Sequence, residues 1–222
     1  LEKHVDGKGL VDYAAWKAAD RGALERYLAA MAAVRPEDLA DVKERLAYWI
    51  DVYNALTIHG MLRFYPTDSI QDHVSHTGGF HFFRDVRIEV SGLERSLDAI
   101  EHEILRPMGE PRIHFAVVCA SVGCPRLRHE AYVGRRIDEQ LEAQAIGFFD
   151  DAGKFRIDRE TGTVYLSKIL DWFGEDFGGS DRAKLDFAAR YVRPEDDRAF
   201  LKRDRLSIEY LDYDWALNET GR

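Results

Sequence analysis

Residues 37–65, EDLADVKERLAYWIDVYNALTIHGMLRFY, carry the most regular hydrophobic pattern in the chain. Large apolar side chains recur there every three or four residues, which is the spacing of one buried stripe along a helix. Pro36 precedes the stretch and Pro66 follows it, and proline is poorly tolerated inside a helix. The pattern therefore predicts one long helix over 37–65. Its expected buried positions are Leu39, Val42, Leu46, Trp49, Ile50, Tyr53, Leu56, Met61 and Phe64.

Shorter patterns on both sides of this helix predict the rest of the fold. We expect helices at 20–34, 97–106, 135–149, 180–192 and 195–203, and strands at 86–90, 113–118 and 206–211. Two alternating segments, 155–158 and 163–166, flank Gly162 and predict a β-hairpin. The expected fold is a predominantly helical α+β domain with a small β-sheet. We expect residues 1–222 to form a single compact domain, on which residues 1–36 pack as an N-terminal helical extension.

The composition restricts the classes of partner. Forty acidic and 31 basic residues give a net charge of -9, which repels nucleic acid and anionic lipid. No apolar stretch approaches the roughly 20 residues of a membrane-spanning helix. Because the chain begins at Leu1 rather than methionine, we expect a processed form, and an export signal removed earlier would leave no trace. If such a signal was removed, the expected location is periplasmic or secreted, and otherwise it is cytoplasmic. The sequence does not indicate an oligomeric state.

Both cysteines lie within one turn that follows the expected strand 113–118. Gly123 permits the chain to reverse between Cys119 and Cys124, so we expect the two sulfurs to be close enough to bond. Three interpretations stay open: a structural disulfide, a reactive thiol, or two inert buried thiols. The reactive thiol would be Cys124, because Pro125 favours the start of a helix and Arg126, like Arg128, adds positive charge; both effects lower a thiol pKa.

Two further polar residues interrupt apolar patterns near this turn. His114 lies in the expected strand, where an offset of five residues puts it on the opposite face from Cys119. A bulge, or use of Cys124 instead, would restore a thiol and imidazole pair, whereas the simpler alternative is a hydrogen-bonded core histidine. Glu101 lies inside the apolar stripe of helix 97–106 and needs a polar partner. That partner is either His114, which Glu101 would orient, or a nearby arginine.

A second group of residues provides candidates for contact with a ligand. Trp49, Tyr53 and Trp215 are candidates for the floor of a pocket, although aromatic residues at helical spacing usually belong to the core. Asn54 and Arg126 are further candidates for substrate contact. Asn54 is also expected to satisfy backbone groups near the cysteine turn. The polar loop around Asp72, His73, His76 and His81 matches no rigid metal motif, so no metal site is predicted.

Four motifs together resemble the family catalogued as domain of unknown function 547. They are AYWIDVYNALT (47–57), SLDAIEHEILR (96–106), HFAVVCASVGCP (114–125) and YDWALN (213–218). The resemblance implies no established activity. Similar bacterial members often carry export signals, which implies an extracytoplasmic location, and the family pattern leads us to expect asparagine where this chain has Asp51.

Two functions of different classes follow. In the first, the protein is a thiol-dependent enzyme for acyl transfer or hydrolysis, with Cys124 or Cys119 as nucleophile, His114 as base and Glu101 orienting the imidazole. In the second, it is an exported, non-catalytic binding or scaffold domain in which a disulfide shapes a surface for a small molecule, peptide or glycan. The sequence contains no glycine-rich phosphate loop and no dinucleotide fingerprint, so no cofactor is predicted.

Overall fold

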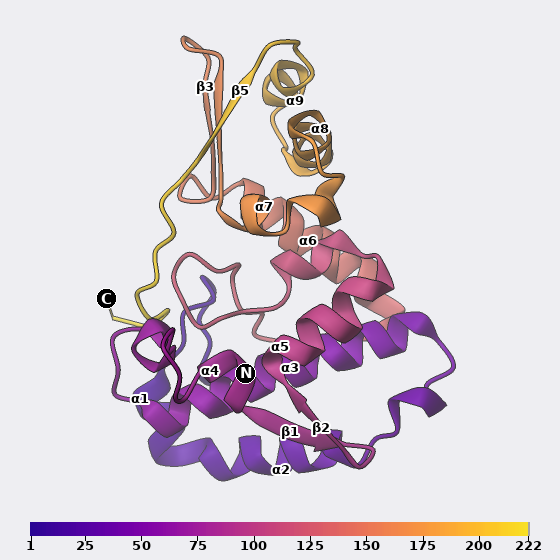
Figure 1. Ribbon diagram of the computed structural model, residues 1–222, viewed down its shortest axis with the longest axis vertical. Coiled ribbons are helices and arrows are strands. Elements are labelled where there is room, and N and C mark those ends of the chain that lie inside the picture. The colour runs from indigo at the N-terminus through magenta and orange to yellow at the C-terminus, as the bar shows by residue number, and fades with distance from the viewer. Residues whose placement is uncertain (222) are drawn as a thin grey trace.

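The computed structural model describes residues 1–221 and has an α+β fold in which helices predominate (Figure 1). The α-helices are α1 (Tyr13–Ala15), α2 (Arg21–Ala32), α3 (Val42–Phe64), α4 (Phe82–Asp85), α5 (Leu97–Ala99), α6 (Ile137–Phe149), α7 (Ile169–Trp172), α8 (Asp181–Tyr191) and α9 (Glu195–Leu201). The strands are β1 (Arg87–Val90), β2 (Leu93–Ser96), β3 (Phe155–Asp158), β4 (Thr163–Leu166) and β5 (Ser207–Tyr210).

Short helical turns of other types connect these elements. Two are π-helical, η1 (Trp16–Asp20) and η4 (Ile100–Leu105). The 3₁₀ turns are η2 (Pro36–Asp38), η3 (Ile70–His73), η5 (Arg106–Met108), η6 (Pro111–Phe115), η7 (Gly134–Arg136) and η8 (Gly174–Phe177). Among residues 1–221, no helix combines the length and the apolar character that crossing a membrane requires.

The long helix α3 confirms the strongest sequence prediction but begins later than expected. Asp41 ends the preceding extended segment, and its carboxylate accepts a hydrogen bond of 2.8 Å from the Lys43 amide, which defines the helix start. The prediction that the helix starts at residue 37 is therefore wrong, because residues 36–38 form the separate turn η2. The helix ends before Pro66, as predicted, and α2 packs along it in accordance with the predicted helix at 20–34.

The two small sheets were predicted to different degrees. The hairpin of β3 and β4 has the predicted bounds, and Gly162 adopts the left-handed conformation (φ +72°) in its turn. Strand β5 adds to it in parallel with β4, in the order β3-β4-β5. The other sheet pairs β1 with β2, and sequence reasoning missed β2. The largely exposed, charged residues of β2 give little alternating hydrophobic signal.

The predicted buried strand at 113–118 is wrong. Glu110 caps a 3₁₀ turn that continues to Phe115, and the following residues form no regular element and join no sheet. The backbone groups of residues 116 and 118 form hydrogen bonds with a side chain instead. Asn54 of α3 donates to the Ala116 carbonyl (2.9 Å) and accepts from the Val118 amide (3.0 Å). This confirms the expected backbone role of Asn54 and explains how an apolar segment can be buried without a ladder of strand hydrogen bonds.

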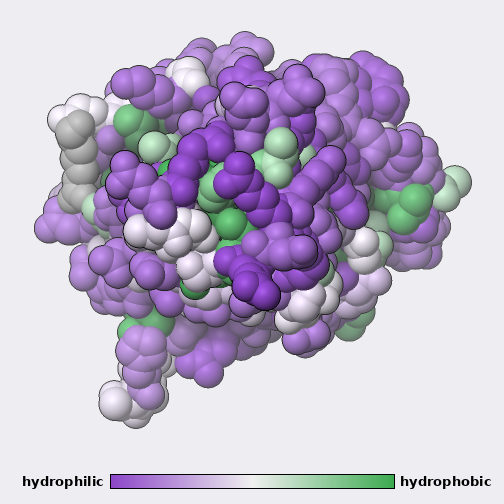
Figure 2. Space-filling view, turned by 90° about the horizontal axis from the view of Figure 1, so that it is seen from above, coloured by the Kyte–Doolittle hydropathy of each residue, from purple (hydrophilic) through white to green (hydrophobic). Residues whose placement is uncertain are grey.

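The buried side chains form two hydrophobic clusters. One surrounds α3 and includes Leu217 near the C-terminus, and the other lies among α6, α8 and the three-stranded sheet. Segment 113–118 contributes to both, since Ile113 belongs to the first cluster and Phe115 to the second. Figure 1 shows the sheet β3-β4-β5 with α8 and α9 at one end of the molecule, and α2 and α3 at the other. Viewed from the former end, the surface is mainly hydrophilic, with scattered apolar patches (Figure 2).

Candidate functional site

A cavity of about 210 Å³ collects most of the side chains that the sequence singled out. Of the predicted site residues, it is lined by Tyr53, Glu101, His114, Cys119 and Cys124. Its other walls include the aromatic side chains of Phe83, Trp172, Phe173, Tyr213 and Trp215. We call it the aromatic cavity. Its residues come from α3, the η4 turn, segment 113–125, α7 and the closing segment 213–215, so the fold unites positions that are far apart in the sequence.

Glu101 lies in the π-helical turn η4, which follows the short helix α5 directly. Such wider turns interrupt α-helices often at functional sites. The Glu101 carboxylate accepts a hydrogen bond of 3.0 Å from the Tyr53 hydroxyl on α3. Burial raises the pKa of Glu101 above its ordinary value, although the nearby His102 and the Tyr53 hydrogen bond oppose the change. The expected pairing of Glu101 with His114 or an arginine is wrong, because Tyr53 occupies that place.

The partner of His114 is Asp176, which sequence reasoning missed. His114 is only 2% exposed, and its Nε2 lies 2.7 Å from an Asp176 carboxylate oxygen. Arg106 also binds that carboxylate, through Nε at 2.7 Å and Nη2 at 2.9 Å. Asp176 stands 62 residues after His114, in the turn η8, and no spacing pattern connects the two positions. A contact of this kind depends on the tertiary fold alone.

Burial decides the protonation state of His114. It lowers the pKa of His114 to about 4, although the Asp176 carboxylate favours the protonated form. At neutral pH the imidazole is therefore neutral, and its contact with Asp176 is a hydrogen bond donated by Nε2 rather than an ion pair. Nδ1 is then the acceptor nitrogen, and it has no hydrogen-bond partner among residues 1–221. The ring stacks on Phe173 with centroids 4.1 Å apart, which fixes its orientation.

The two cysteines confirm the predicted proximity. Their Cα atoms are 6.2 Å apart and their sulfurs lie at disulfide-bonding distance. The Tyr213 hydroxyl lies 3.1 Å from the Cys119 sulfur and 3.2 Å from the Cys124 sulfur. The closing segment also fixes the backbone of the turn, because the Gly123 amide donates to the Asp214 carbonyl at 2.8 Å. Motif 213–218 therefore holds the cysteine turn in place.

Of the surroundings predicted to activate Cys124, the helix start is not found. Residues 125–133 are irregular, and the next helical turn is η7, so Pro125 does not begin a helix and no helix N-terminus faces the sulfur. Arg128 pairs with Glu130, whereas Arg126 lines a second cavity together with Cys124. Cys124 itself is only 5% exposed. The predicted helix start at Pro125 is thus wrong, and of the two predicted arginines Arg128 is paired with Glu130.

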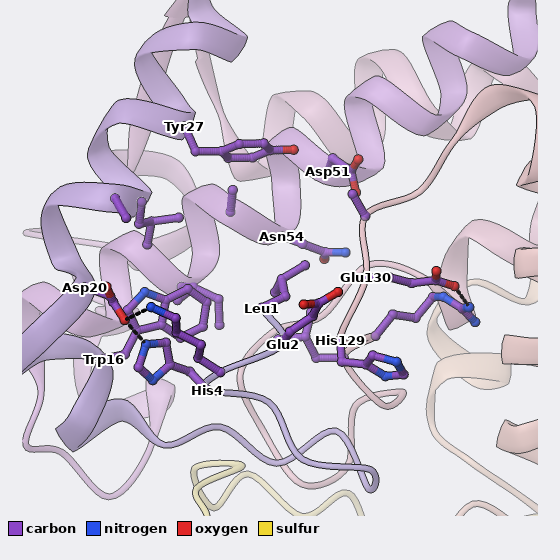
Figure 3. Close-up of a pocket in the computed structure, with 18 of the residues that line it drawn as sticks. Leu1, Glu2, His4, Trp16, Asp20, Tyr27, Asp51, Asn54, His129 and Glu130 are labelled. Atoms are coloured by element: carbon purple, nitrogen blue, oxygen red, sulfur yellow. Dashed lines mark hydrogen bonds and ion pairs between the residues drawn. The ribbon is translucent and has the colours of Figure 1, made fainter.

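The remaining predicted ligand contacts lie outside the aromatic cavity. Trp49 is buried and packs edge-on against Tyr48, with ring centroids 5.0 Å apart. Asn54, besides binding the backbone of 116–118, borders a larger cavity of about 510 Å³ between α2, α3 and segment 127–132 (Figure 3). Its polar groups are separated, with His4 bonded to Asp20 on one side and Asp51 on another (Figure 3). The aromatic cavity is smaller but brings the candidate chemical groups together.

Asp51 is the unusual group of the larger cavity. Its carboxylate accepts a hydrogen bond of 3.0 Å from the Tyr132 amide. Burial nevertheless raises the pKa of Asp51 to about 7, so the carboxyl is largely protonated in weakly acidic solution. Asp51 is also the position at which the family resemblance predicts asparagine instead of aspartate.

The histidine loop is held by contacts of its own. His73 stacks on Phe64 with ring centroids 4.2 Å apart, and its Nε2 lies 3.1 Å from the Thr67 hydroxyl. Across the described part of the chain, no three His, Cys, Asp or Glu side chains are grouped so that they could hold a metal ion. His81 also reaches the aromatic cavity, at its border.

Comparison with known proteins identifies the chain at the level of a family. A family model described as "Protein of unknown function, DUF547" matches residues 36–149. This range runs from the η2 turn through α3 to the end of α6, and it includes Glu101, His114 and the cysteine turn. No curated protein and no solved structure matches the chain. The chain is a member of the DUF547 family.

Proposed function

We propose that this protein is a binding domain whose aromatic cavity takes the cationic end of a small ligand, with Glu101 as the countercharge. The observation that carries the proposal is the environment of Glu101. Its carboxylate accepts one side-chain hydrogen bond, from Tyr53, and makes no ion pair among residues 1–221. No cation is in direct contact with this carboxylate, and the more distant charges of His102 and Arg106 offset its desolvation only in part, because its pKa stays raised. A ligand cation would restore that balance.

The walls of the cavity suit the same ligand chemistry. Tyr213 packs against two tryptophans, with centroid distances of 4.8 Å to Trp172 and 4.5 Å to Trp215, and the two tryptophans also stack on each other at 5.7 Å. The faces of such rings attract ammonium groups, and the attraction is strongest where water is excluded. Trp172 is 48% exposed, so it borders the cavity on the solvent side, where it can contact an entering ligand.

The volume limits the size of the bound group. At about 210 Å³ the cavity is smaller than the roughly 300–1,000 Å³ typical of sites for drug-sized molecules. It therefore suits a single head group, such as the ammonium of a small molecule or of a peptide side chain. In this function the cysteine pair has a structural role, since it shapes part of the cavity wall.

One observation favours a second candidate, a thiol-dependent acyl transferase or hydrolase. Both sulfurs, His114 and Glu101 line the same cavity, as such an enzyme would require. A nucleophile would exist only after the sulfurs were reduced, so the enzyme would work in its reduced form. Rapid alkylation of reduced Cys124 by iodoacetamide near pH 7, abolished by Cys124→Ser and slowed by His114→Ala, would favour this candidate. A reduced thiol that reacts no faster than free cysteine would count against it.

The binding function is tested with two probes of similar shape and different charge. Choline carries a trimethylammonium group, and 3,3-dimethylbutan-1-ol has a neutral tert-butyl group in its place. We expect choline to quench tryptophan fluorescence through Trp172 and Trp215 and to bind at least about tenfold more tightly than the neutral alcohol. Glu101→Gln should remove that preference. Glu103→Gln is the matched control, because Glu103 is exposed on the same turn and should leave it unchanged.

Three outcomes would contradict the proposal. They are equal affinity for the two probes, a preference for choline that survives in Glu101→Gln, and an equal loss in Glu103→Gln. The pH dependence gives a further check. Because the cation favours the ionised carboxylate and burial raises the pKa of Glu101, choline affinity should increase as pH rises through that pKa.

A further inference from the structure

A second polar cavity, of about 490 Å³, lies on the other side of the cysteine turn. Cys124 and Pro125 line both this cavity and the aromatic one. The cavity is also lined by residues 121, 122 and 126 around the cysteine turn, by the N-terminal loop 8–10, by the end of α6 with the residues after it, and by Arg193 and Asn218. We call it the basic cavity, because of the charges that face it.

The charges of the basic cavity do not balance. Four cationic side chains line it, from Lys8, Arg126, Lys154 and Arg193, against only two carboxylates. Both carboxylates are engaged: Asp151 binds Lys154 at 2.7 Å, and Asp150 pairs with Arg193. Lys8 and Arg126 make no side-chain ion pair or hydrogen bond within residues 1–221. Two positive charges are thus left over, in a chain whose net charge is -9.

Arg126 is exposed at the cavity, and its backbone is held in place. Its backbone carbonyl accepts a hydrogen bond of 2.8 Å from the Gln144 side chain on α6. Its guanidinium lies against Gly147 of the same helix, where a Cβ would collide with Nη2. From the other side, Gly9 approaches the Arg126 Cα so closely that a Cβ there would lie 2.9 Å from it. Gly9 therefore leaves room for the backbone of Arg126, and Gly147 leaves room for its guanidinium. The guanidinium makes no direct ion pair, and its charge helps to lower the pKa of the nearby Asp151.

Lys154 adds a buried cation to the same wall. It is 7% exposed, and its ammonium lies 2.7 Å from Asp151 and 3.3 Å from the Val122 carbonyl. The Val122 carbonyl belongs to the cysteine turn, so Lys154 connects α6 and the residues after it to that turn. An anion in the cavity would meet this buried ammonium as well as the two unpaired cations.

We infer that the basic cavity binds a phosphate group, either as the free ion or on a small phosphomonoester. The two unpaired cations match the two negative charges of a phosphate dianion. A guanidinium presents paired donors that fit phosphate oxygens, and an ammonium adds a strong point charge. The site is distinct from the aromatic cavity in both position and sign of charge, and the inference does not depend on the function proposed there.

The experiment is a calorimetric titration of the whole chain with inorganic phosphate and, separately, phenyl phosphate, at constant ionic strength. We expect saturable binding in the millimolar range or tighter. Arg126→Gln and Lys8→Gln should each weaken binding about tenfold, the loss of one charge-assisted contact. Arg135→Gln is the matched control, since Arg135 is also exposed and unpaired but lies outside the cavity, and it should bind as the wild type does.

A third variant separates a built site from a general charge effect. Gly147→Ala keeps every charge but displaces the Arg126 guanidinium from α6, so we expect it to weaken binding while the protein stays folded. Tighter binding of phenyl phosphate than of phosphate would identify an organic phosphomonoester as the ligand, and the reverse would identify the free ion. No saturable binding, or an equal loss in Arg126→Gln and Arg135→Gln, would overturn the inference.

Discussion

Asp51→Asn should stabilise the protein at neutral and alkaline pH and leave it nearly unchanged in acid. The carboxyl is desolvated at the border of the larger cavity, where Figure 3 shows it on α3 beside the labelled Tyr27 and Asn54. Asparagine is close in shape, and its carbonyl oxygen can still accept the hydrogen bond from the Tyr132 amide. The substitution therefore removes only a charge that the site disfavours.

The magnitude follows from linkage between protonation and folding. The pKa of Asp51 rises from 3.8 to about 7 in the folded protein, because burial disfavours the charged form. The folded state thus binds the proton more tightly, and stability falls as pH rises from about 4 to about 7. Three pKa units at about 1.36 kcal/mol each set an upper limit of about 4 kcal/mol. Because the Asp51 side chain keeps partial exposure, we expect about 2–4 kcal/mol.

The assay is urea unfolding of the wild type and Asp51→Asn at pH 4.5 and pH 8. The variant should be more stable by that amount at pH 8 and by less than about 1 kcal/mol at pH 4.5. Asp204→Asn is the control, because Asp204 is exposed and should change stability by less than about 0.5 kcal/mol at either pH. A gain of equal size at both pH values, or a loss at pH 8, would refute the assignment of a desolvated, raised-pKa carboxyl.

Three other substitutions test the fold. Asn54→Ala should lower the free energy of unfolding by about 2–4 kcal/mol in urea titrations, because it leaves the buried Ala116 and Val118 backbone groups unpaired, and a loss below about 1 kcal/mol would contradict this. Burial lowers the pKa of His114 to about 4, so the wild type should lose about 3 kcal/mol as pH falls from 6.5 to 4, and His114→Asn should lose less over the same range. Gly162→Ala should cost about 1–2 kcal/mol at its left-handed φ of +72°, as measured by thermal unfolding, and a neutral result would show that the turn relaxes.

The sequence predicted those elements whose signals are local. The hairpin of β3 and β4 was predicted with its bounds because Gly162 and two alternating segments lie within twelve residues. Segment 113–118 has the pattern of a buried strand, because the apolar run looks the same in the sequence whether its backbone is hydrogen-bonded to neighbouring strands or to side chains. The pairing group is Asn54, 62 residues away from Ala116, and no local pattern reports it.

The sequence predicts which residues of the candidate site lie near one another, but it does not predict their hydrogen-bond partners. Glu101, His114 and the cysteines were expected to be neighbours, and they line one cavity. The partners differ, because Glu101 meets Tyr53 and His114 meets Asp176. A buried polar residue can be recognised in a sequence because it interrupts an apolar pattern. Its hydrogen-bond partner on a surface turn interrupts no such pattern and cannot be recognised in this way. Asp176 lies in such a turn and carries no signal.

The charges that the fold leaves without partners point to ligands more directly than any motif does. Most charged side chains around the cysteine turn are paired within the protein, as Arg106 is with Asp176 and Lys154 with Asp151. The charges without a direct ion pair differ in sign between the cavities, with Glu101 in the aromatic cavity and both Lys8 and Arg126 in the basic cavity. Both cavities border the cysteine turn, which the closing segment 213–218 fixes. If these charges were only solvated surface groups, Glu101→Gln and Arg126→Gln would each change ligand binding no more than their matched controls. If they are binding groups, each substitution should remove one class of ligand and leave the other intact, because the two cavities share the turn but not the charges.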